Sequence, residues 1–206
     1  MKATMKTLSA ILICCFISTI QMYGENIQRP ESENYVKGVE ALNEGNPEAA
    51  YTYLNAEINE HPDNGYAHCY MALICNFCND TKLALQALNS SLELIPEADT
   101  EYRSFAHYSR GVLLTNLKMW ERAEADLNEA IRLNPEDVEN YKSRAQLYLE
   151  TERYEESLND LTRALKLDSK ADVNDLVLQL MAVAPTSEFM ERITATYQQL
   201  DQVTIH

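Results

Sequence analysis

The feature that most constrains this chain is a short motif that ends four segments of similar length. It reads INEHPDN at 58–64, LELIPEA at 92–98, IRLNPED at 131–137 and LKLDSKA at 165–171. The spacing defines a 34-residue repeat over residues 31–64, 65–98, 104–137 and 138–171, with a five-residue polar insertion at 99–103. A fixed period of this length is typical of a fold that stacks one supersecondary unit several times.

Small residues recur at three positions of the repeat, where they let two antiparallel helices approach each other closely. They are Gly38, Ala72, Gly111 and Ala145 at the eighth position, Ala50, Ala84, Ala123 and Ser157 at the twentieth, and Ser91, Ala130 and Ala164 at the twenty-seventh. Glu57 is the exception at the twenty-seventh position, which predicts looser packing of the first repeat. Proline follows the expected second helix in three repeats and would end it, whereas Ser169 stands there in the fourth.

These repeats resemble the tetratricopeptide repeat, whose unit is a 34-residue helix–turn–helix. The resemblance implies an all-α fold, a right-handed α-solenoid of antiparallel helix pairs. Residues 172–200 keep apolar residues at helical spacing, but Gln179 and Glu191 stand where small residues belong. We therefore expect a divergent helical hairpin that caps four repeats. Residues 25–30 are expected to be a flexible segment, and 201–206 a C-terminal tail.

The first 24 residues have the pattern of a secretory signal peptide. Lys2 and Lys6 precede an apolar run over residues 8–20, which is short for a bilayer span, and Gly24 provides a plausible cleavage point. The alternatives are an uncleaved membrane anchor and a lipid anchor at Cys14 or Cys15, against which the lack of a small residue before Cys14 argues. We predict an exported protein of the bacterial periplasm or envelope, with no membrane span in the mature chain.

The composition excludes several classes of protein. The 206 residues include 17 Lys and Arg against 32 Asp and Glu, a net charge of −15, or −17 once the leader is removed. Such acidity argues against nucleic-acid binding, and 5 Gly and 6 Pro are too few for an all-β fold. Acidic residues such as Glu121 and Glu124 fall on expected second helices, which indicates a solvated outer face.

No motif points to a cofactor, and the sequence predicts no metal site and no enzyme. Cys75 and Cys78 form a CxxC pair, but at the end of an expected helix, whereas reactive pairs sit at a helix N-terminus. We expect cysteines packed as small core residues, with a disulfide among Cys69, Cys75 and Cys78 left open. His68 and His107 share the fourth position, where we expect core histidines rather than metal ligands.

The resemblance implies that the first helix of each repeat lines a concave groove that binds a protein or peptide. The groove positions form an aromatic and apolar strip with amide donors in the first three repeats and a charged rim in the fourth. The predicted contact residues are Tyr35, Val39, Tyr66, Leu73, Asn76, Phe77, Phe105, Tyr108, Val112, Asn116, Lys142 and Gln146.

One subtype of the family grips a C-terminal carboxylate with Lys, Asn and Arg side chains. This chain has none of those side chains at the corresponding positions, which hold Tyr35, Val39, Tyr70, Phe105 and Ser109. We therefore predict an exported, non-enzymatic scaffold whose partner is a protein or peptide but not a chaperone tail. The alternatives are a thiol–disulfide redox protein using Cys69, Cys75 and Cys78, and a structural subunit of an envelope assembly that self-associates through its ends.

Overall fold

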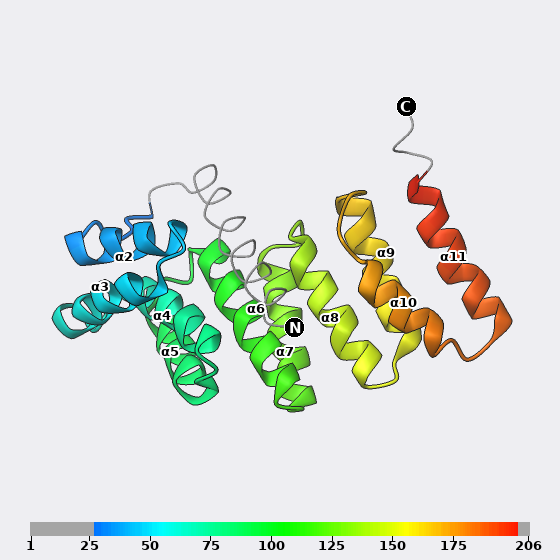
Figure 1. The fold of residues 1–206 in the computed structure, drawn as a ribbon, viewed down its shortest axis with the longest axis horizontal. Coiled ribbons are helices and arrows are strands. Elements are labelled where there is room, and N and C mark those ends of the chain that lie inside the picture. The colour runs from blue at the N-terminus through cyan, green and yellow to red at the C-terminus, as the bar shows by residue number, and fades with distance from the viewer. Residues whose placement is uncertain (1–26, 202–206) are drawn as a thin grey trace. The chain divides into compact units, whose positions relative to one another are not determined.

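The computed structural model describes residues 27–201, and within them the chain forms ten α-helices and no strand. The expected signal peptide and residues 25, 26 and 202–206 lie outside the described residues. The chain divides into two compact units, with the boundary between Ala106 and His107. The expectation of an all-α fold is confirmed (Figure 1).

Unit 1 contains two complete helix pairs and the start of a third. Its helices are α2 (Glu33–Asn43), α3 (Pro47–Glu60), α4 (Gly65–Phe77), α5 (Thr81–Leu94) and the first part of α6 (Thr100–Asn116). Unit 2 contains the remainder of α6, followed by α7 (Trp120–Leu133), α8 (Val138–Glu150), α9 (Tyr154–Leu167), α10 (Asn174–Ala182) and α11 (Ser187–Asp201). Within unit 1, α2 packs against α3, α3 against α4 and α4 against α5, and within unit 2, α7 packs against α8 and α8 against α9.

The eighth position of the repeat is a point of helix contact. A Cβ atom added to Gly38 would lie 2.7 Å from Leu54 Cγ, and one added to Gly111 would lie 2.8 Å from Leu127 Cγ. Both leucines are completely buried because the glycines leave room for them. Glu57, the exception at the twenty-seventh position, is also buried, and Asn64 Nδ2 donates to its Oε1 atom at 2.8 Å.

Short polar residues start several helices, and proline follows the ends of others. Side-chain oxygens of Asn46, Asn64 and Asp80 accept hydrogen bonds from backbone N–H groups in the first turns of α3, α4 and α5. These caps satisfy donors that have no partner inside the helix. The helices α3, α5 and α7 each end two residues before a proline. Sequence therefore marks both helix starts and helix ends.

The turn inside each repeat uses one left-handed residue at the same position. Gly45, Asn79, Lys118 and Glu152 all stand at the fifteenth position, with φ between 58° and 71°. Glycine adopts this conformation without steric cost, whereas Lys and Glu do so with strain. Three of the four repeats therefore place a residue with a Cβ atom where glycine would fit better.

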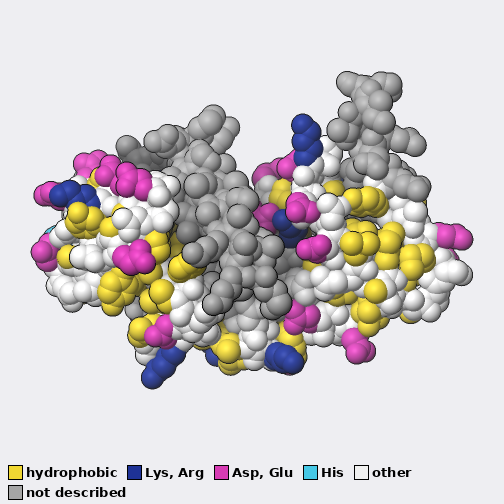
Figure 2. All heavy atoms as spheres, in the orientation of Figure 1, with side chains coloured by type: hydrophobic (Ala, Val, Ile, Leu, Met, Phe, Trp, Pro, Cys, Tyr) yellow, Lys and Arg dark blue, Asp and Glu magenta, His cyan; other side chains and the backbone are white. Residues whose placement is uncertain are grey.

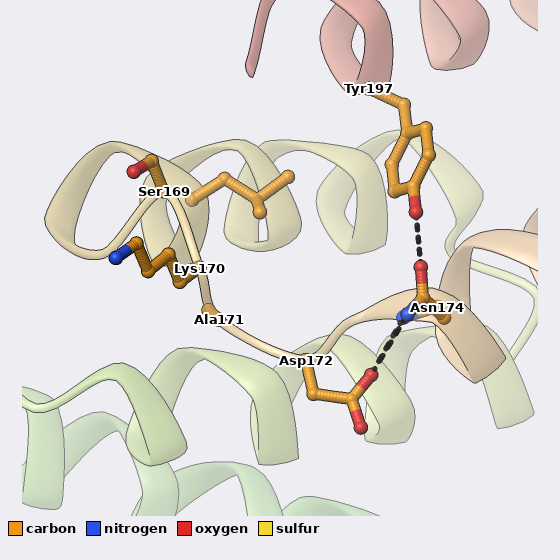
Figure 3. A pocket seen from close by; sticks show the side chains of 7 residues that line it. Ser169, Lys170, Ala171, Asp172, Asn174 and Tyr197 are labelled. Carbon is orange, nitrogen blue, oxygen red and sulfur yellow. Dashed lines mark hydrogen bonds between the residues drawn. The ribbon is translucent and has the colours of Figure 1, made fainter. Parts of the chain in front are cut away.

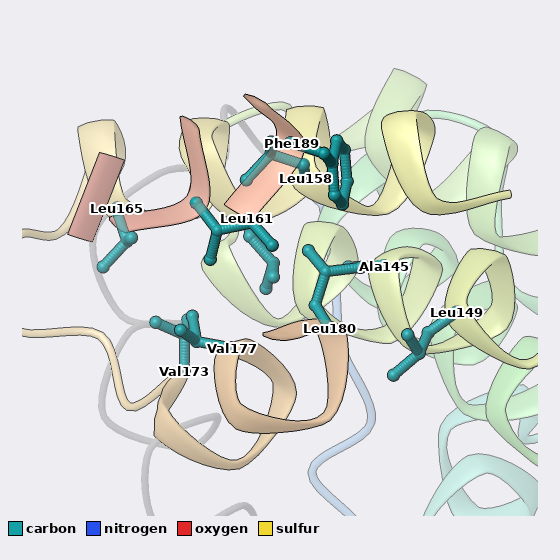
Figure 4. Packing of buried hydrophobic residues seen from close by; sticks show 10 residues of the cluster. Ala145, Leu149, Leu158, Leu161, Leu165, Val173, Val177, Leu180 and Phe189 are labelled. Atoms are coloured by element: carbon teal, nitrogen blue, oxygen red, sulfur yellow. The ribbon is translucent and has the colours of Figure 1, made fainter. Parts of the chain in front are cut away.

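The hairpin expected at 172–200 is present as α10 and α11, and it packs onto the preceding helix pair. Val177 and Leu180 of α10, with Phe189 and Ile193 of α11, join Leu161 in one buried cluster (Figure 4). The cluster covers apolar surface of α8 and α9 that would otherwise be exposed. This packing is the capping that a stack of repeats requires.

We expect Glu152→Gly to raise the free energy of unfolding by about 0.5–1 kcal/mol, because relief of the left-handed strain exceeds the added flexibility of the unfolded chain. Gly45→Ala is the matched change in the opposite direction and should lower it by about 1 kcal/mol. Urea denaturation followed by circular dichroism measures both. A loss of stability in Glu152→Gly would show that the turn carries no strain at that residue.

Candidate functional site

Four tyrosines from three helices form a buried cluster in unit 1. Tyr35 of α2 lies beside Tyr70 of α4, with ring centroids 6.1 Å apart. Tyr102 of α6 contacts Tyr66 edge to face at 4.8 Å, and its hydroxyl lies 2.9 Å from that of Tyr70. Tyr35 and Tyr66 were predicted to contact a ligand, but the structure buries most of both side chains among these neighbours.

Beside the tyrosines lies a guanidinium group held by two carboxylates. Arg29 Nε and Asp99 Oδ2 are 3.2 Å apart, and Arg29 Nη2 and Glu101 Oε2 are also 3.2 Å apart. Arg29 Cζ lies 4.6 Å from the centre of the Tyr102 ring. Asp99 is only 1% exposed and also accepts hydrogen bonds from the Tyr66 hydroxyl at 2.9 Å and the Tyr102 backbone N–H at 3.3 Å.

This group of residues was not predicted from the sequence. Residues 99–103 were expected to be a polar insertion between repeats, whereas residues 100–103 begin α6, which has 17 residues against 13 in α4. A helix-start signal was present, because Asp99 precedes Thr100 and Glu101 in the manner of an N-cap followed by an acidic first turn. Residues 25–30 were expected to be flexible, and in the structure Arg29 of this segment is bonded to Asp99 and Glu101.

Electrostatics fix the charge states in this cluster. Burial raises the pKa of Tyr35, Tyr66, Tyr70 and Tyr102, so all four hydroxyls are neutral at physiological pH. Burial alone would lower the pKa of Arg29, but hydrogen bonding and attraction to Asp99 raise it. The guanidinium therefore stays cationic among neutral hydroxyls and two carboxyl groups.

The other predicted contact residues of unit 1 are more accessible. Val39, Leu73 and Phe105 are partly buried. Asn76 and Phe77 are exposed at the end of α4, and Phe77 is 44% exposed. The end of α4 therefore presents an aromatic ring and an amide to solvent.

In unit 2 the predicted residues lie on α6 and α8. Tyr108 and Val112 are partly buried, and Asn116 is exposed at the end of α6. Lys142 Nζ bonds to Glu139 Oε1 at 2.7 Å, and Gln146 Nε2 donates to Glu150 Oε1 at 2.8 Å. The charged rim expected in the fourth repeat is thus paired within its own helix.

Each unit contains a pocket lined by polar groups. In unit 2, a pocket of about 210 Å³ is lined by residues between Leu165 and Asn174 and by Tyr197 (Figure 3). Its polar groups bond to each other, since the Tyr197 hydroxyl and Asp172 both bond to Asn174. In unit 1, a pocket of about 280 Å³ is lined by residues including Ser32 and Glu57.

The histidines and acidic residues that the structure describes do not gather into a metal site. Among residues 27–201, no group of three or more His, Cys, Asp or Glu side chains is arranged to hold a metal ion. His68 Nε2 lies 3.0 Å from the Pro62 carbonyl oxygen, and His107 Nδ1 lies 2.9 Å from Asp126 Oδ1. Both of these histidines therefore have a ring nitrogen in a hydrogen bond to the protein.

The three cysteines of the described segment are free thiols. Burial raises the pKa of Cys69 to about 12, and burial with the nearby Asp80 raises the pKa of Cys75. Cys78 is exposed and caps the C-terminal end of α4. A raised pKa reduces the thiolate fraction on which disulfide exchange depends, so these sites do not favour the redox alternative.

The third and fourth repeats each contain an Arg–Asp ion pair between their two helices, which was not predicted from the sequence. Arg110 in α6 bonds through Nε and Nη2 to both carboxylate oxygens of Asp126 in α7, at 2.7 and 2.8 Å. Arg144 and Asp160 repeat the arrangement between α8 and α9, with both distances 2.7 Å. The first two repeats have Lys37 with Tyr53, and Met71 with Ala87, at these positions. The paired charges thus distinguish the two halves of the chain.

Comparison with known proteins agrees with this geometry. Two family models described as tetratricopeptide repeat match residues 104–137 and 139–170. The chain is a tetratricopeptide repeat protein. The matched segments are the two repeats that contain the Arg–Asp pairs between their helices.

Several known proteins resemble this tetratricopeptide repeat protein. A curated relative is the lipoprotein NlpI homolog of Haemophilus influenzae, 31% identical over 87 residues, which are 42% of this chain and only 28% of the relative. The structure of MamA residues 41 to the end, from Desulfovibrio magneticus RS-1, has a TM-score of 0.65 and 19% identity, and the match covers 84% of this chain and 96% of that solved chain. The protein TTC0263 of Thermus thermophilus, a thermophilic TPR protein, has a TM-score of 0.56 and 17% identity, covering 82% of this chain and all of that one. At these identities the structural likeness concerns the fold alone.

Over residues 27–201, no helix of this tetratricopeptide repeat protein combines the length and the apolar character that crossing a membrane requires.

We expect Asp126→Asn to lower the free energy of unfolding by about 2 kcal/mol at pH 7, because it leaves the partly buried Arg110 without its carboxylate. Burial alone would raise the pKa of Asp126, but Arg110 and His107 lower it below its ordinary value. The stabilisation is therefore complete above the unfolded pKa of about 3.9 and is lost as the pH falls through the lower folded pKa.

The measurement is urea denaturation of both proteins at pH 7 and pH 3. The difference between them should shrink at pH 3. Glu136→Gln is the control, because the carboxylate of Glu136 is exposed and its pair with Arg163 spans 3.7 Å, so its effect should stay below about 0.5 kcal/mol. An equal effect of the two substitutions would contradict the assignment.

Proposed function

We propose that this tetratricopeptide repeat protein is an exported, non-enzymatic scaffold that binds a protein or peptide along the first helices of its repeats. The observation that supports this most directly is the end of α4, where Phe77 is exposed beside Asn76. Asn116 is exposed at the end of α6, at the position equivalent to Phe77. An exposed ring beside an amide group suits a peptide, which offers apolar side chains and backbone groups to bond.

The proposed location is the cell envelope. Support comes from the leader pattern of residues 1–24 and from the similarity to a protein named as a lipoprotein. That match covers a small part of the relative, so its properties enter here only as a proposal. We retain cleavage after Gly24 as the proposed processing step.

To test the binding surface, Phe77→Ala and Asn116→Ala are made separately and together and used to capture partners from envelope extract after crosslinking. Each single change should reduce the captured partner several-fold, and the double change at least tenfold, because both side chains are exposed and contribute to binding rather than to the core. Circular dichroism should show an unchanged fold.

The matched control is Tyr51→Ala, which removes an exposed aromatic ring from α3, a second helix. Capture by this variant should equal that of the wild type. Unchanged capture by the Phe77→Ala/Asn116→Ala protein would remove the first-helix surface from the proposal.

A second candidate is a structural subunit that self-associates through the end of unit 2. Leu178 on α10 is 64% exposed, and Val183 just after this helix is also exposed. Figure 2 shows hydrophobic side chains gathered on the face of unit 2 near its C-terminal end. Exposed apolar patches of this kind often mark contacts between chains.

If this end self-associates, Leu178→Glu should convert an oligomer into a monomer in sedimentation velocity, because it places a charge inside the contact. Glu191→Gln, an exposed change on α11, serves as the control and should leave the oligomer intact. A wild-type protein that is monomeric at high micromolar concentration would exclude this candidate.

A further inference from the structure

The guanidinium of Arg29 occupies a pocket that unit 1 builds without it. Asp99 is held by the Tyr66 hydroxyl and by the backbone N–H of Tyr102, which it caps at the start of α6. The Tyr102 ring is fixed in turn by edge-to-face contacts with Tyr66 and Tyr70. The Asp99 carboxylate and the Tyr102 ring are therefore held in place by contacts that do not involve Arg29.

The chemistry of this pocket selects arginine. A planar cation lies over an aromatic face while two carboxylates accept its N–H groups from the side. Lysine has a compact ammonium that cannot stack and cannot bond in two directions with one planar group. Because Asp99 is almost completely buried, the pocket is unfavourable without a cation.

The segment that carries Arg29 packs imperfectly against unit 1. It precedes α2, whose N-cap residue Ser32 makes no side-chain capping bond. Residues 30–32 line the pocket of about 280 Å³ in unit 1, and within the described chain Ser32 Oγ and Glu57 Oε2 have no hydrogen-bond partner there. Glu57 is 1% exposed, so this carboxylate oxygen is buried and unpartnered beside the segment. A loosely fitted segment thus lies next to a well-formed arginine pocket.

We propose that the Asp99–Glu101–Tyr102 pocket recognises an arginine side chain of the partner peptide, and that Arg29 occupies it within the chain until the partner displaces it. This inference rests on the proposed function and specifies it: the partner carries an accessible arginine in an extended segment. The predicted contact residues Tyr35 and Tyr66 belong to the tyrosine cluster that supports the pocket. The net charge of −15 adds long-range attraction for a cationic peptide.

The test uses the full chain and defined fluorescent peptides. One is Ile-Gln-Arg-Pro-Glu-Ser, which reproduces residues 27–32, and another is Gly-Gly-Arg-Gly-Gly, which shares only the arginine. Arg29→Ala should bind both at least tenfold more tightly than the wild type, because the pocket no longer holds its own arginine. Peptides with lysine or citrulline in place of arginine should bind at least tenfold more weakly to Arg29→Ala.

Two further variants separate recognition from general effects of charge and folding. Glu101→Gln added to Arg29→Ala should weaken arginine-peptide binding several-fold while leaving the thermal unfolding temperature of Arg29→Ala unchanged, since Glu101 lies at the partly exposed edge of the pocket. Arg163→Ala removes one arginine from an exposed pair elsewhere and should bind the peptides like the wild type.

The proposal is overturned if Arg29→Ala binds arginine peptides no more tightly than the wild type, or if lysine and citrulline peptides bind equally well. The peptide measurement needs no natural partner. Failure of the arginine-pocket proposal can therefore be distinguished from failure of the proposed function. Peptide binding without any captured envelope partner would refute only the scaffold function. Capture that depends on Phe77 without peptide binding would refute only the arginine pocket.

Discussion

The close contact between the two helices of each repeat is the constraint on which the rest of the structure depends. Gly38 and Gly111 leave space that Leu54 and Leu127 fill completely, so the first and second helices meet almost backbone to side chain. This contact buries one face of each first helix. The remaining face is then available either for the neighbouring repeat or for a partner, which is why a repeat with so little loop sequence can still bind.

The two units satisfy their polar groups in different ways. Unit 2 uses the same Arg–Asp pair twice, inside single repeats, at positions sixteen residues apart. Unit 1 has no such pair at these positions and instead joins Arg29 to Asp99 across 70 residues of sequence. A pair inside one repeat holds that repeat's own helices together, whereas the long-range pair holds the segment before the first repeat to the start of α6. The Arg–Asp pairs inside single repeats lie in the segments that the family models match.

The helix pairs could be predicted from sequence because their signals are local and repeated. Small residues at the eighth position and prolines after the second helices recur with the period itself, so each repeat supports the interpretation of the others. Gly45 and Asn79 are residue types that often adopt the left-handed conformation, whereas Lys118 and Glu152 adopt it against the usual preference of their types. Here the repeat geometry overrides the local preference of the residue.

The tyrosine cluster and its arginine could not be predicted, for two physical reasons. Asp99 and Tyr102 lie in the insertion, outside the periodic frame, so no equivalent residue in another repeat indicated their environment. Arg29 lies before the first repeat, and nothing local connects it to a residue 70 positions away. Tyr35 and Tyr66 were placed on the surface by their position in the repeat, and the longer α6 supplies the ring of Tyr102 that covers Tyr66.

The burial of Asp99 also determines how a partner could reach this part of unit 1. An exposed carboxylate could lose its arginine to water at little cost, but a carboxylate that is 1% exposed cannot. Release of Arg29 is therefore favourable only when another cation of the same shape takes its place, which makes binding an exchange of one guanidinium for another. Such an exchange discriminates between partners more sharply than an open groove would, because a peptide without arginine must leave a buried charge unpaired. Arg29 holds the start of the described chain against Asp99. A group that replaces Arg29 there must therefore also be a guanidinium.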